Sequence, residues 1–96
     1  SEAAGLKHKT GQIYNSLAWL TKVQRKLDLA MDYTYKAETI LKEVGDPAGI
    51  AESYNVRGLT YTLLKDYAKA EVEYKKSLAI RTEINLSKGI AGSLYN

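Results

Sequence analysis

The chain has 96 residues, of which 45% are hydrophobic and 26% charged, with a net charge of +3. This composition is typical of one small globular domain, and the mixed signs of charge predict no nucleic-acid partner. The absence of cysteine excludes disulfides and thiolate metal sites but leaves the compartment open, with the cytoplasm favoured. Because no apolar run approaches the roughly 18 residues of a membrane helix, we expect no membrane contact by this segment.

Apolar residues recur at three- and four-residue intervals along most of the chain, which is typical of amphipathic helices. We expect the first ten residues to be frayed or to belong to a preceding helix. The pattern predicts helices at about 11–25, 28–44, 48–64 and 67–84, and another from 88 onward. Residues expected to form the buried stripe of the fourth helix are Tyr67, Ala70, Tyr74, Ser77, Leu78 and Ile84.

Short signals mark the ends of these helices. Gly45 suits the left-handed residue that ends a helix, and Asn85 occupies the matching place later in the chain. Asp46 is expected to cap the next helix, with Pro47 at its first position. Asp66 is the expected cap of the fourth helix.

The chain repeats itself after forty residues. The stretch "GIAESYN", which begins at Gly49, returns as "GIAGSLYN" at Gly89. Each period contains two helices, and since one helix pair cannot bury its outer face, we expect the pairs to stack. Small residues should let the paired helices approach closely, while large tyrosines fill the neighbouring space. The small residues are Ala18, Ala30, Gly58 and Ala70, and the tyrosines are Tyr54, Tyr61 and Tyr74.

The stretch "AESYNVRGLTYTLLKDYAKAEVEYKKSLAI" (51–80) resembles a tetratricopeptide repeat. Its forty-residue period resembles the longer-helix variety of bacterial regulators and sensor proteins and of some eukaryotic scaffolds. The residues at the family's characteristic positions are Tyr54, Gly58, Tyr61, Ala70, Tyr74 and Leu78, with Asp66 and Tyr67 in the turn.

The resemblance implies an all-α fold, an α-α superhelix of stacked antiparallel helix pairs, which is a tetratricopeptide solenoid. The single domain, 1–96, would hold one repeat at about 11–50, a second at about 51–90 and the start of a third at about 91–96. The chain starts without methionine and stops inside a patterned segment, so we expect it to be a piece of a longer regulatory or sensory protein.

Four residues depart from the family pattern. Arg57 stands where an apolar residue is usual, Thr21 and Thr34 replace aromatic residues, and Lys26 replaces the acidic residue of the turn. These departures predict that the first repeat packs more loosely or is shaped for a specific purpose.

In this family the first helix of each pair lines a concave surface that holds an extended or helical peptide. Stacked asparagines there could bond a peptide backbone, and an apolar stripe could hold its anchors. Asn96 lies one place beyond the register of the other asparagines, where many longer-repeat relatives carry a ligand-facing one. The predicted concave residues are Gln12, Asn15, Trp19, Lys22, Val23, Glu52, Asn55, Leu59, Thr62, Leu63 and Asn96.

Two alternatives stay open for this surface. Neighbouring elements, or a second copy of the chain, would cover the apolar stripe, and the asparagines would hydrogen-bond locally or face solvent. The basic residues Lys22, Arg25 and Lys26 have two interpretations as well. They would clamp an acidic peptide or a C-terminal carboxylate, or they would interact with the carbonyls at a helix C-terminus.

No catalytic, metal or cofactor motif is present in the sequence, so we expect no enzyme activity and no cofactor. His8 has no evident acid partner, and Asp28 and Asp32 are expected to be solvated. The sequence therefore predicts a protein-interaction module that binds a protein or peptide partner, or another segment of its own full-length chain. The alternative is a structural spacer or a self-association element that forms a homodimer through exposed solenoid ends.

Overall fold

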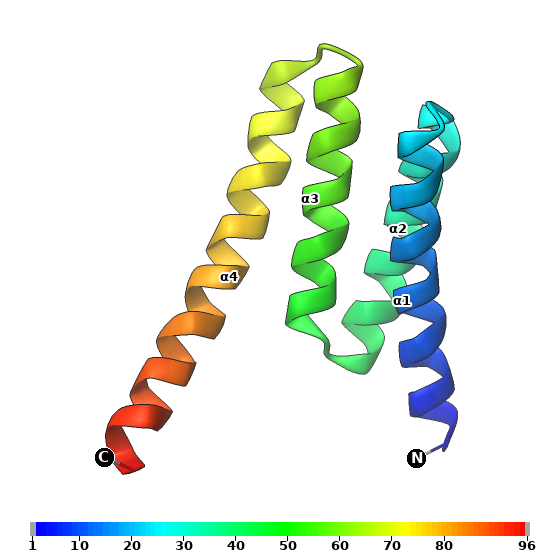
Figure 1. The fold of residues 1–96 in the computed structure, drawn as a ribbon. Helices are drawn as coiled ribbons and strands as arrows, with labels where there is room; N and C mark the ends of the chain where they lie inside the picture. Colours follow the sequence, from blue (N-terminus) through cyan, green and yellow to red (C-terminus); the bar gives the residue numbers. More distant parts are fainter. Residues whose placement is uncertain (1, 96) are drawn as a thin grey trace.

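The protein is all-helical. The computed structural model describes the backbone of residues 2–95 and the side chains of residues 2–89. Within this range four helices follow one another, with short turns between them (Figure 1). They are α1 (Glu2–Val23), α2 (Leu27–Val44), α3 (Pro47–Leu63) and α4 (Tyr67–Tyr95).

The helices form two antiparallel pairs. Helix α1 packs against α2 and α3 packs against α4, while α3 also contacts both α2 and α1. The pairs are therefore joined through α3, and α4 packs on α3 alone among the described helices. Figure 1 shows that the C-terminal part of α4 continues past the start of α3 and diverges from the other helices.

The turn within each pair has the same hydrogen bonds, forty residues apart. The N–H of Lys26 donates to the carbonyl of Thr21 at 2.8 Å, and the N–H of Asp66 donates to that of Tyr61 at 2.9 Å. The residue before each donor, Arg25 or Lys65, has a positive φ of 64° or 62°. The sequence repeat thus corresponds to a repeat in local backbone geometry, although a left-handed residue without glycine is uncommon.

The turn between α2 and α3 follows the sequence signals. Gly45 ends α2 with a φ of 71°, Pro47 is the first residue of α3, and the Asp46 carboxylate accepts a bond from the N–H of Gly49. Burial alone would raise the pKa of Asp46, but bonds from His8 and from Gly49 outweigh it and lower that pKa. The predicted cap is therefore confirmed, and the cap carboxylate is held in its charged form.

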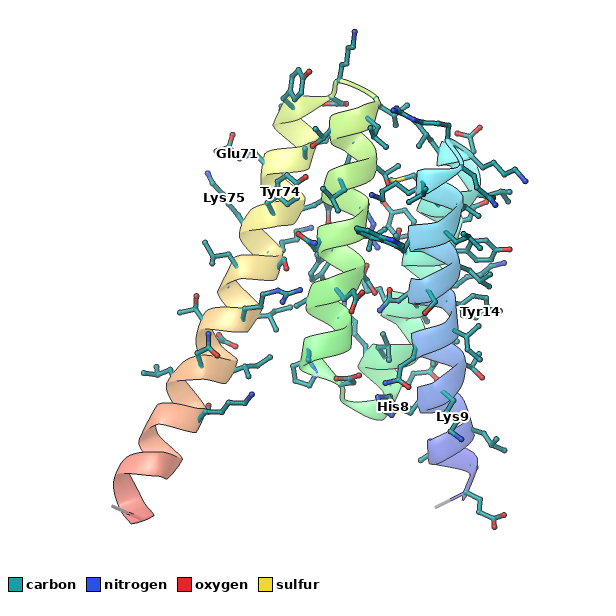
Figure 2. All side chains as sticks on the ribbon, viewed as in Figure 1. His8, Lys9, Tyr14, Glu71, Tyr74 and Lys75 are labelled. Carbon is teal, nitrogen blue, oxygen red and sulfur yellow. The ribbon has the colours of Figure 1, made fainter. Side chains whose placement is uncertain are left out.

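The expectation that the first ten residues are frayed or belong to a preceding helix is wrong, because α1 itself begins at Glu2 and runs unbroken to Val23. His8 also has an acid partner that the sequence did not indicate. Its Nε2 atom lies 2.8 Å from Oδ2 of Asp46. This contact connects α1 to the residue that caps α3. His8 is labelled on α1 in Figure 2.

The predicted break between residues 84 and 88 is also wrong, because α4 is one helix from Tyr67 to Tyr95. The reason lies in the residues that replace the earlier turn. Asn85 stands forty residues after Gly45, and Leu86 stands forty residues after Asp46. A leucine has no oxygen with which to cap a new helix, and Ser87 replaces Pro47, the residue that cannot continue a helix, so the helical hydrogen bonds run on.

The predicted small residues lie in the core. Ala18, Ala30 and Ala70 are buried, and Gly58 lies directly against the ring of Tyr74. The expected buried stripe of α4 holds only in part, because Tyr67 is 63% exposed and Leu78 is 65% exposed. Helix α4 packs on α3 alone among the described helices, so part of its surface stays uncovered.

The contact of Gly58 with Tyr74 leads to a testable prediction. A Cβ atom at position 58 would lie 2.7 Å from Cε1 of Tyr74, whose rigid ring cannot give way cheaply. We expect Gly58→Ala to destabilise the domain by about 1 kcal/mol in urea unfolding, although alanine is the better helix former. The matched control is Gly5→Ala in α1, where no atom lies within 4 Å. It should stabilise by a few tenths to about 1 kcal/mol, and an equal gain at position 58 would contradict the prediction.

Candidate binding surface on α1 and α3

The predicted concave residues lie on α1 and α3, which contact one another. Their exposure varies widely along both helices. Gln12, Trp19, Val23 and Glu52 are exposed, whereas Asn15 is buried. The partly buried members are Lys22, Asn55, Leu59, Thr62 and Leu63. Asn96, the last predicted member, lies outside the described residues.

Asn15 does not face solvent. Its Nδ2 donates to the carbonyl of Gly49 at 3.0 Å, and its Oδ1 accepts from the hydroxyl of Ser53 at 2.8 Å. Both partners are on α3, so the amide bonds α1 to α3 inside the molecule. Asn15 is therefore neither solvent-exposed nor bonded to its sequence neighbours, because its partners lie 34 and 38 residues away on another helix, and its amide is already engaged.

Trp19 is the large aromatic residue of this surface and is 48% exposed. The Nζ atom of Lys22, one turn along α1, lies 3.8 Å from the centre of the Trp19 ring system. This is a cation–π contact at an exposed site, worth about 0.5–1 kcal/mol. Val23 follows on the same helix and is 59% exposed. Trp19 and Val23 therefore form an accessible apolar patch with one cation beside it.

On α3 the matching residues are less accessible. Leu59 and Leu63 are both partly buried. The hydroxyl of Thr62 donates to the carbonyl of Gly58 at 2.9 Å and lies 3.1 Å from the hydroxyl of Tyr74. Thr62 thus joins α3 to α4, and the two leucines lie on α3, the helix that contacts α1.

The basic residues Lys22, Arg25 and Lys26 lie around the turn that follows α1. Lys22 is in the last turn of the helix, next to Trp19, and Arg25 is the residue with positive φ. Lys26 precedes the first residue of α2 and makes no side-chain cap bond there. Cations at a helix C-terminus are stabilising whether or not a ligand is bound.

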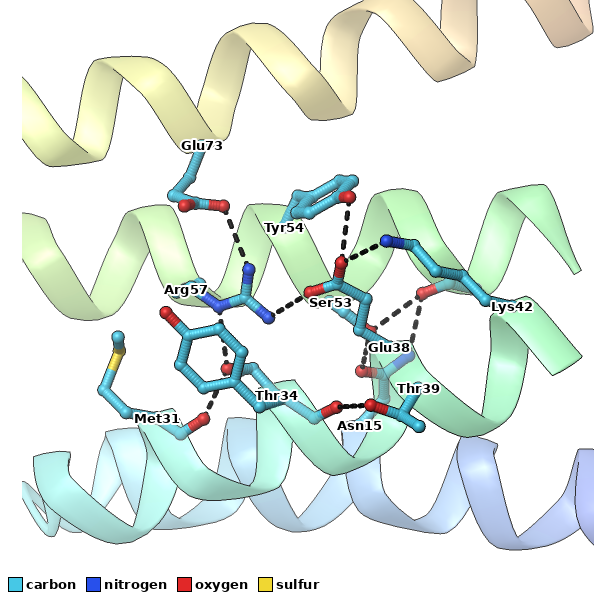
Figure 3. Close-up of polar contacts among 12 residues, drawn as sticks. Asn15, Met31, Thr34, Glu38, Thr39, Lys42, Ser53, Tyr54, Arg57 and Glu73 are labelled. Carbon is cyan, nitrogen blue, oxygen red and sulfur yellow. Dashed lines mark hydrogen bonds and ion pairs between the residues drawn. The ribbon is translucent and has the colours of Figure 1, made fainter.

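A buried polar cluster that sequence reasoning missed lies between α2, α3 and α4 (Figure 3). Its centre is Arg57, which is only 2% exposed. The guanidinium donates to Glu38 at 2.7 Å, to Glu73 at 3.2 Å and to the hydroxyl of Thr34 at 3.1 Å. The ring of Tyr35 lies 3.8 Å from the guanidinium carbon. One arginine therefore holds three helices together through two carboxylates.

Glu38 is the most connected acid in this cluster. It also accepts a hydrogen bond from the hydroxyl of Tyr54 at 3.0 Å, and it forms an ion pair with Lys42 at 2.8 Å. Burial would raise the pKa of Glu38, but the bonds from Lys42, Arg57 and Tyr54 together outweigh burial and lower it. The carboxylate is therefore charged in the folded protein at neutral pH.

Two departures from the family pattern turn out to be partners. Arg57 and Thr34 were unusual residues at apolar positions, and in the structure they are hydrogen-bonded to each other. Thr34 is fully buried, and its hydroxyl donates a hydrogen bond to the carbonyl of Met31 at 2.6 Å. The Thr34 side chain is thus enclosed and hydrogen-bonded, and whether the first repeat as a whole is loose or shaped for a specific purpose stays a prediction. The sequence offered one clue to this cluster, since Arg57 can donate hydrogen bonds and Thr34 can accept them.

Comparisons of this chain with protein-family models, with curated proteins and with solved structures find no match. Among the described residues, no group of three or more histidine or acidic side chains is placed to hold a metal ion. None of the helices in the described range has the length and apolar character needed to cross a membrane.

Proposed function

We propose that this chain is a tetratricopeptide-like interaction module, built as a superhelix of helix pairs, that binds a peptide or helix of a partner protein across α1 and α3. The observation that carries the proposal is the exposed patch of Trp19 and Val23 on α1, the helix that contacts α3, where Leu59 and Leu63 are partly exposed. Tryptophan is among the side chains that most often dominate binding energy, because its large apolar surface is desolvated on contact.

The residue chemistry favours a particular kind of partner. Trp19 and Val23 would take apolar anchors at helical spacing, and Lys22, held over the indole, would meet an acidic group next to them. Asn15 is left out of the binding set because its amide bonds Gly49 and Ser53. The partner sequence expected is thus an amphipathic segment with two apolar residues flanked by an acid.

The proposal is tested with peptides selected on the immobilised chain from a random twelve-residue library displayed on phage. Selected peptides are synthesised and titrated while the fluorescence of Trp19, the single tryptophan, is followed. We expect the emission to shift to shorter wavelength as the indole loses water. Trp19→Ala should weaken binding by at least about tenfold, which is the effect of a typical interface anchor.

The matched control is Leu64→Ala, because Leu64 is an exposed apolar residue of similar accessibility that follows α3 rather than lining this patch. It should bind selected peptides with unchanged affinity. Peptides that bind Trp19→Ala as tightly as the natural chain, without any change in emission, would overturn the proposed surface.

A further inference from the structure

Helix α4 carries a shallow, mainly apolar hollow of about 250 Å³, and Tyr74 and Leu78 are part of its lining. Forty residues earlier in the sequence stand Thr34 and Glu38 of α2. Those two side chains accept hydrogen bonds from the guanidinium of Arg57, so α3 fills the corresponding place on α2. On α4 that place is open, and Leu78 is 65% exposed.

Helix α1 stands forty residues before α3 and has an uncovered apolar face. Ile13 and Leu20 are 58% and 50% exposed, and Leu17 between them is partly exposed. Their counterparts on α3 are all buried, and these are Ser53, Arg57 and Thr60. Figure 1 shows α4 on one side of α3 and the α1–α2 pair on the other. The chain therefore has one open apolar face on α1 and a second one on α4.

The open faces of α1 and α4 match each other in chemistry. The interface between α2 and α3 is polar, because Arg57 meets Glu38 there. The residue forty positions before Arg57 is Leu17, on α1. An arginine placed against Leu78 would find no acid at that position, whereas a leucine there buries apolar surface on both sides. The polar pair is thus replaced on both faces together, as an interface between α1 and α4 requires.

A second observation on α3 points to the same partner. The amide of Asn15 on α1 donates to the backbone carbonyl of Gly49 on α3. Its counterpart forty residues later, Asn55, is partly exposed, and its side chain bonds no described residue. The counterpart of Gly49 is Lys9 on α1, and its backbone carbonyl is an acceptor whatever the side chain. Asn55 could therefore bond α1 of a second copy as Asn15 bonds α3.

We propose that copies of this chain stack head to tail, with α1 of one copy packed on α4 and α3 of the next, as α3 packs on α2 and α1. Leu17 then lies against Tyr74 and Leu78 in the hollow. Compared with the α2–α3 pair, α1 is longer at its start and α4 at its end, and antiparallel packing brings these extensions alongside each other. The interface is heterologous, so each copy keeps one free face and further copies can add.

This stacking goes beyond the proposed binding of a peptide. Thr62, a member of the predicted concave set, also lines the hollow, whereas Trp19 and Val23 do not. The experiments below use neither Trp19 nor Val23. Stacking can therefore fail while peptide binding holds, and the reverse.

Sedimentation of the natural chain over micromolar to millimolar concentrations provides the first test. We expect the average mass to rise past that of a dimer as the concentration increases, because a heterologous contact does not close after two copies. A chain that stays monomeric, or one that stops at a dimer, would overturn the proposal.

Two variants that each block one face provide the second test. Leu78→Glu places a charge in the hollow, and Ile13→Glu places one on the face of α1, both at exposed positions. Each variant alone should associate at least about tenfold more weakly than the natural chain, because a charge would be buried without a partner. Mixed in equal amounts, the two variants should form a one-to-one dimer and nothing larger, since each supplies the face that the other lacks.

The matched controls add the same charge on other sides of the two helices. They are Val72→Glu and Gln12→Glu, at exposed residues whose counterparts in the repeat, Asp32 and Glu52, are exposed as well. Both controls should stack as the natural chain does. An equal loss in the controls, or a mixture of the blocked variants that forms no dimer, would contradict head-to-tail stacking.

A charge exchange tests the register without changing the apolar faces. Leu41 on α2 lies against Gly49 on α3, so the same register brings Arg81 close to Lys9 of the next copy. Both cations are exposed. Their repulsion is therefore small, and Arg81→Glu or Lys9→Glu alone should strengthen association about two- to fivefold.

A chain with both charge changes should return to the affinity of the natural chain, because like charges meet again. If the double variant associates as tightly as the single variants, the register is wrong. This test stands even if Leu78→Glu or Ile13→Glu were to unfold the domain, because it leaves both residues unchanged.

Discussion

Replacing Arg57 by methionine will destabilise the domain by about 3–5 kcal/mol, the cost of removing one partner from a buried ion pair. The guanidinium is 2% exposed and is the shared partner of Glu38 on α2 and Glu73 on α4. Methionine fills much of the volume but donates no hydrogen bond. Glu73 and the hydroxyl of Thr34 would lose the guanidinium as a donor, and Glu38 would keep only Tyr54 and Lys42. Urea unfolding followed by circular dichroism measures the loss.

Three further variants establish that the loss comes from the unpaired carboxylates. Arg57→Lys keeps the charge but not the forked geometry, so we expect an intermediate loss. Adding Glu38→Gln and Glu73→Gln to Arg57→Met should recover part of the stability, because no uncompensated charge remains. Arg81→Met, at an exposed arginine of α4, should change stability by no more than about 0.5 kcal/mol. A loss at Arg57 as small as that at Arg81 would contradict the role of the cluster.

The same cluster determines the direction of the pH dependence. The pKa of Glu38 is lowered in the folded state, so its contribution to stability is present above the pKa of the unfolded chain. That contribution is lost as the pH falls through the lower, folded-state value. We therefore expect the natural chain to lose stability below about pH 4.5, near the ordinary range of glutamate. Below that pH, the difference in unfolding free energy between the natural chain and Arg57→Met should become smaller.

Replacing Leu41 by alanine will cost about 2–5 kcal/mol, because it opens a cavity where three helices meet. Leu41 is fully buried on α2. Its Cδ2 atom lies 2.7 Å from the place a Cβ would take at Gly11 of α1, and its Cδ1 atom lies 2.8 Å from that place at Gly49 of α3. One side chain therefore packs against two glycines on different helices. Chemical denaturation reports the loss in the free energy of unfolding.

A second substitution tests whether the cavity is the cause. Gly11→Ala alone should destabilise, since its methyl group would collide with Leu41. In the double variant with Leu41→Ala, that methyl group enters the vacated space. The double variant should therefore lose less unfolding free energy than the two single variants lose together. Leu29→Ala, at an exposed leucine of the same helix, should cost far less than Leu41→Ala. Strictly additive losses would show that the two sites do not share a cavity.

Local signals in the sequence predicted the positions of the helices well where a turn is encoded by neighbouring residues. Gly45, Asp46 and Pro47 supply a left-handed residue, a cap and a first helical residue, and the turn forms there as expected. The same reasoning was wrong at Asn85, because a weak glycine substitute followed by Leu86 carries no cap. A helix ends where several consecutive residues all favour a turn, and the second copy of this linker keeps only some of those residues.

The candidate site could be predicted only in outline. Periodicity placed Asn15, Trp19 and Val23 on one helix, but it could not tell that Asn15 turns into the α1–α3 contact while Trp19 stays half exposed. Residues four positions apart differ in direction by about 40°, and that difference decides whether a side chain meets α3 or solvent. The choice depends on where the neighbouring helix lies, which the local sequence does not contain.

By itself the sequence determined an all-helical chain with a forty-residue period, small residues at the helix crossings and a capped turn before α3, because these features depend on neighbouring residues. The tertiary structure alone decided the partners of Arg57. Glu38 lies nineteen residues before it and Glu73 sixteen residues after it, on different helices. It also left Leu78 exposed, because a continuous α4 carries the end of the chain away from the face that a further helix would cover.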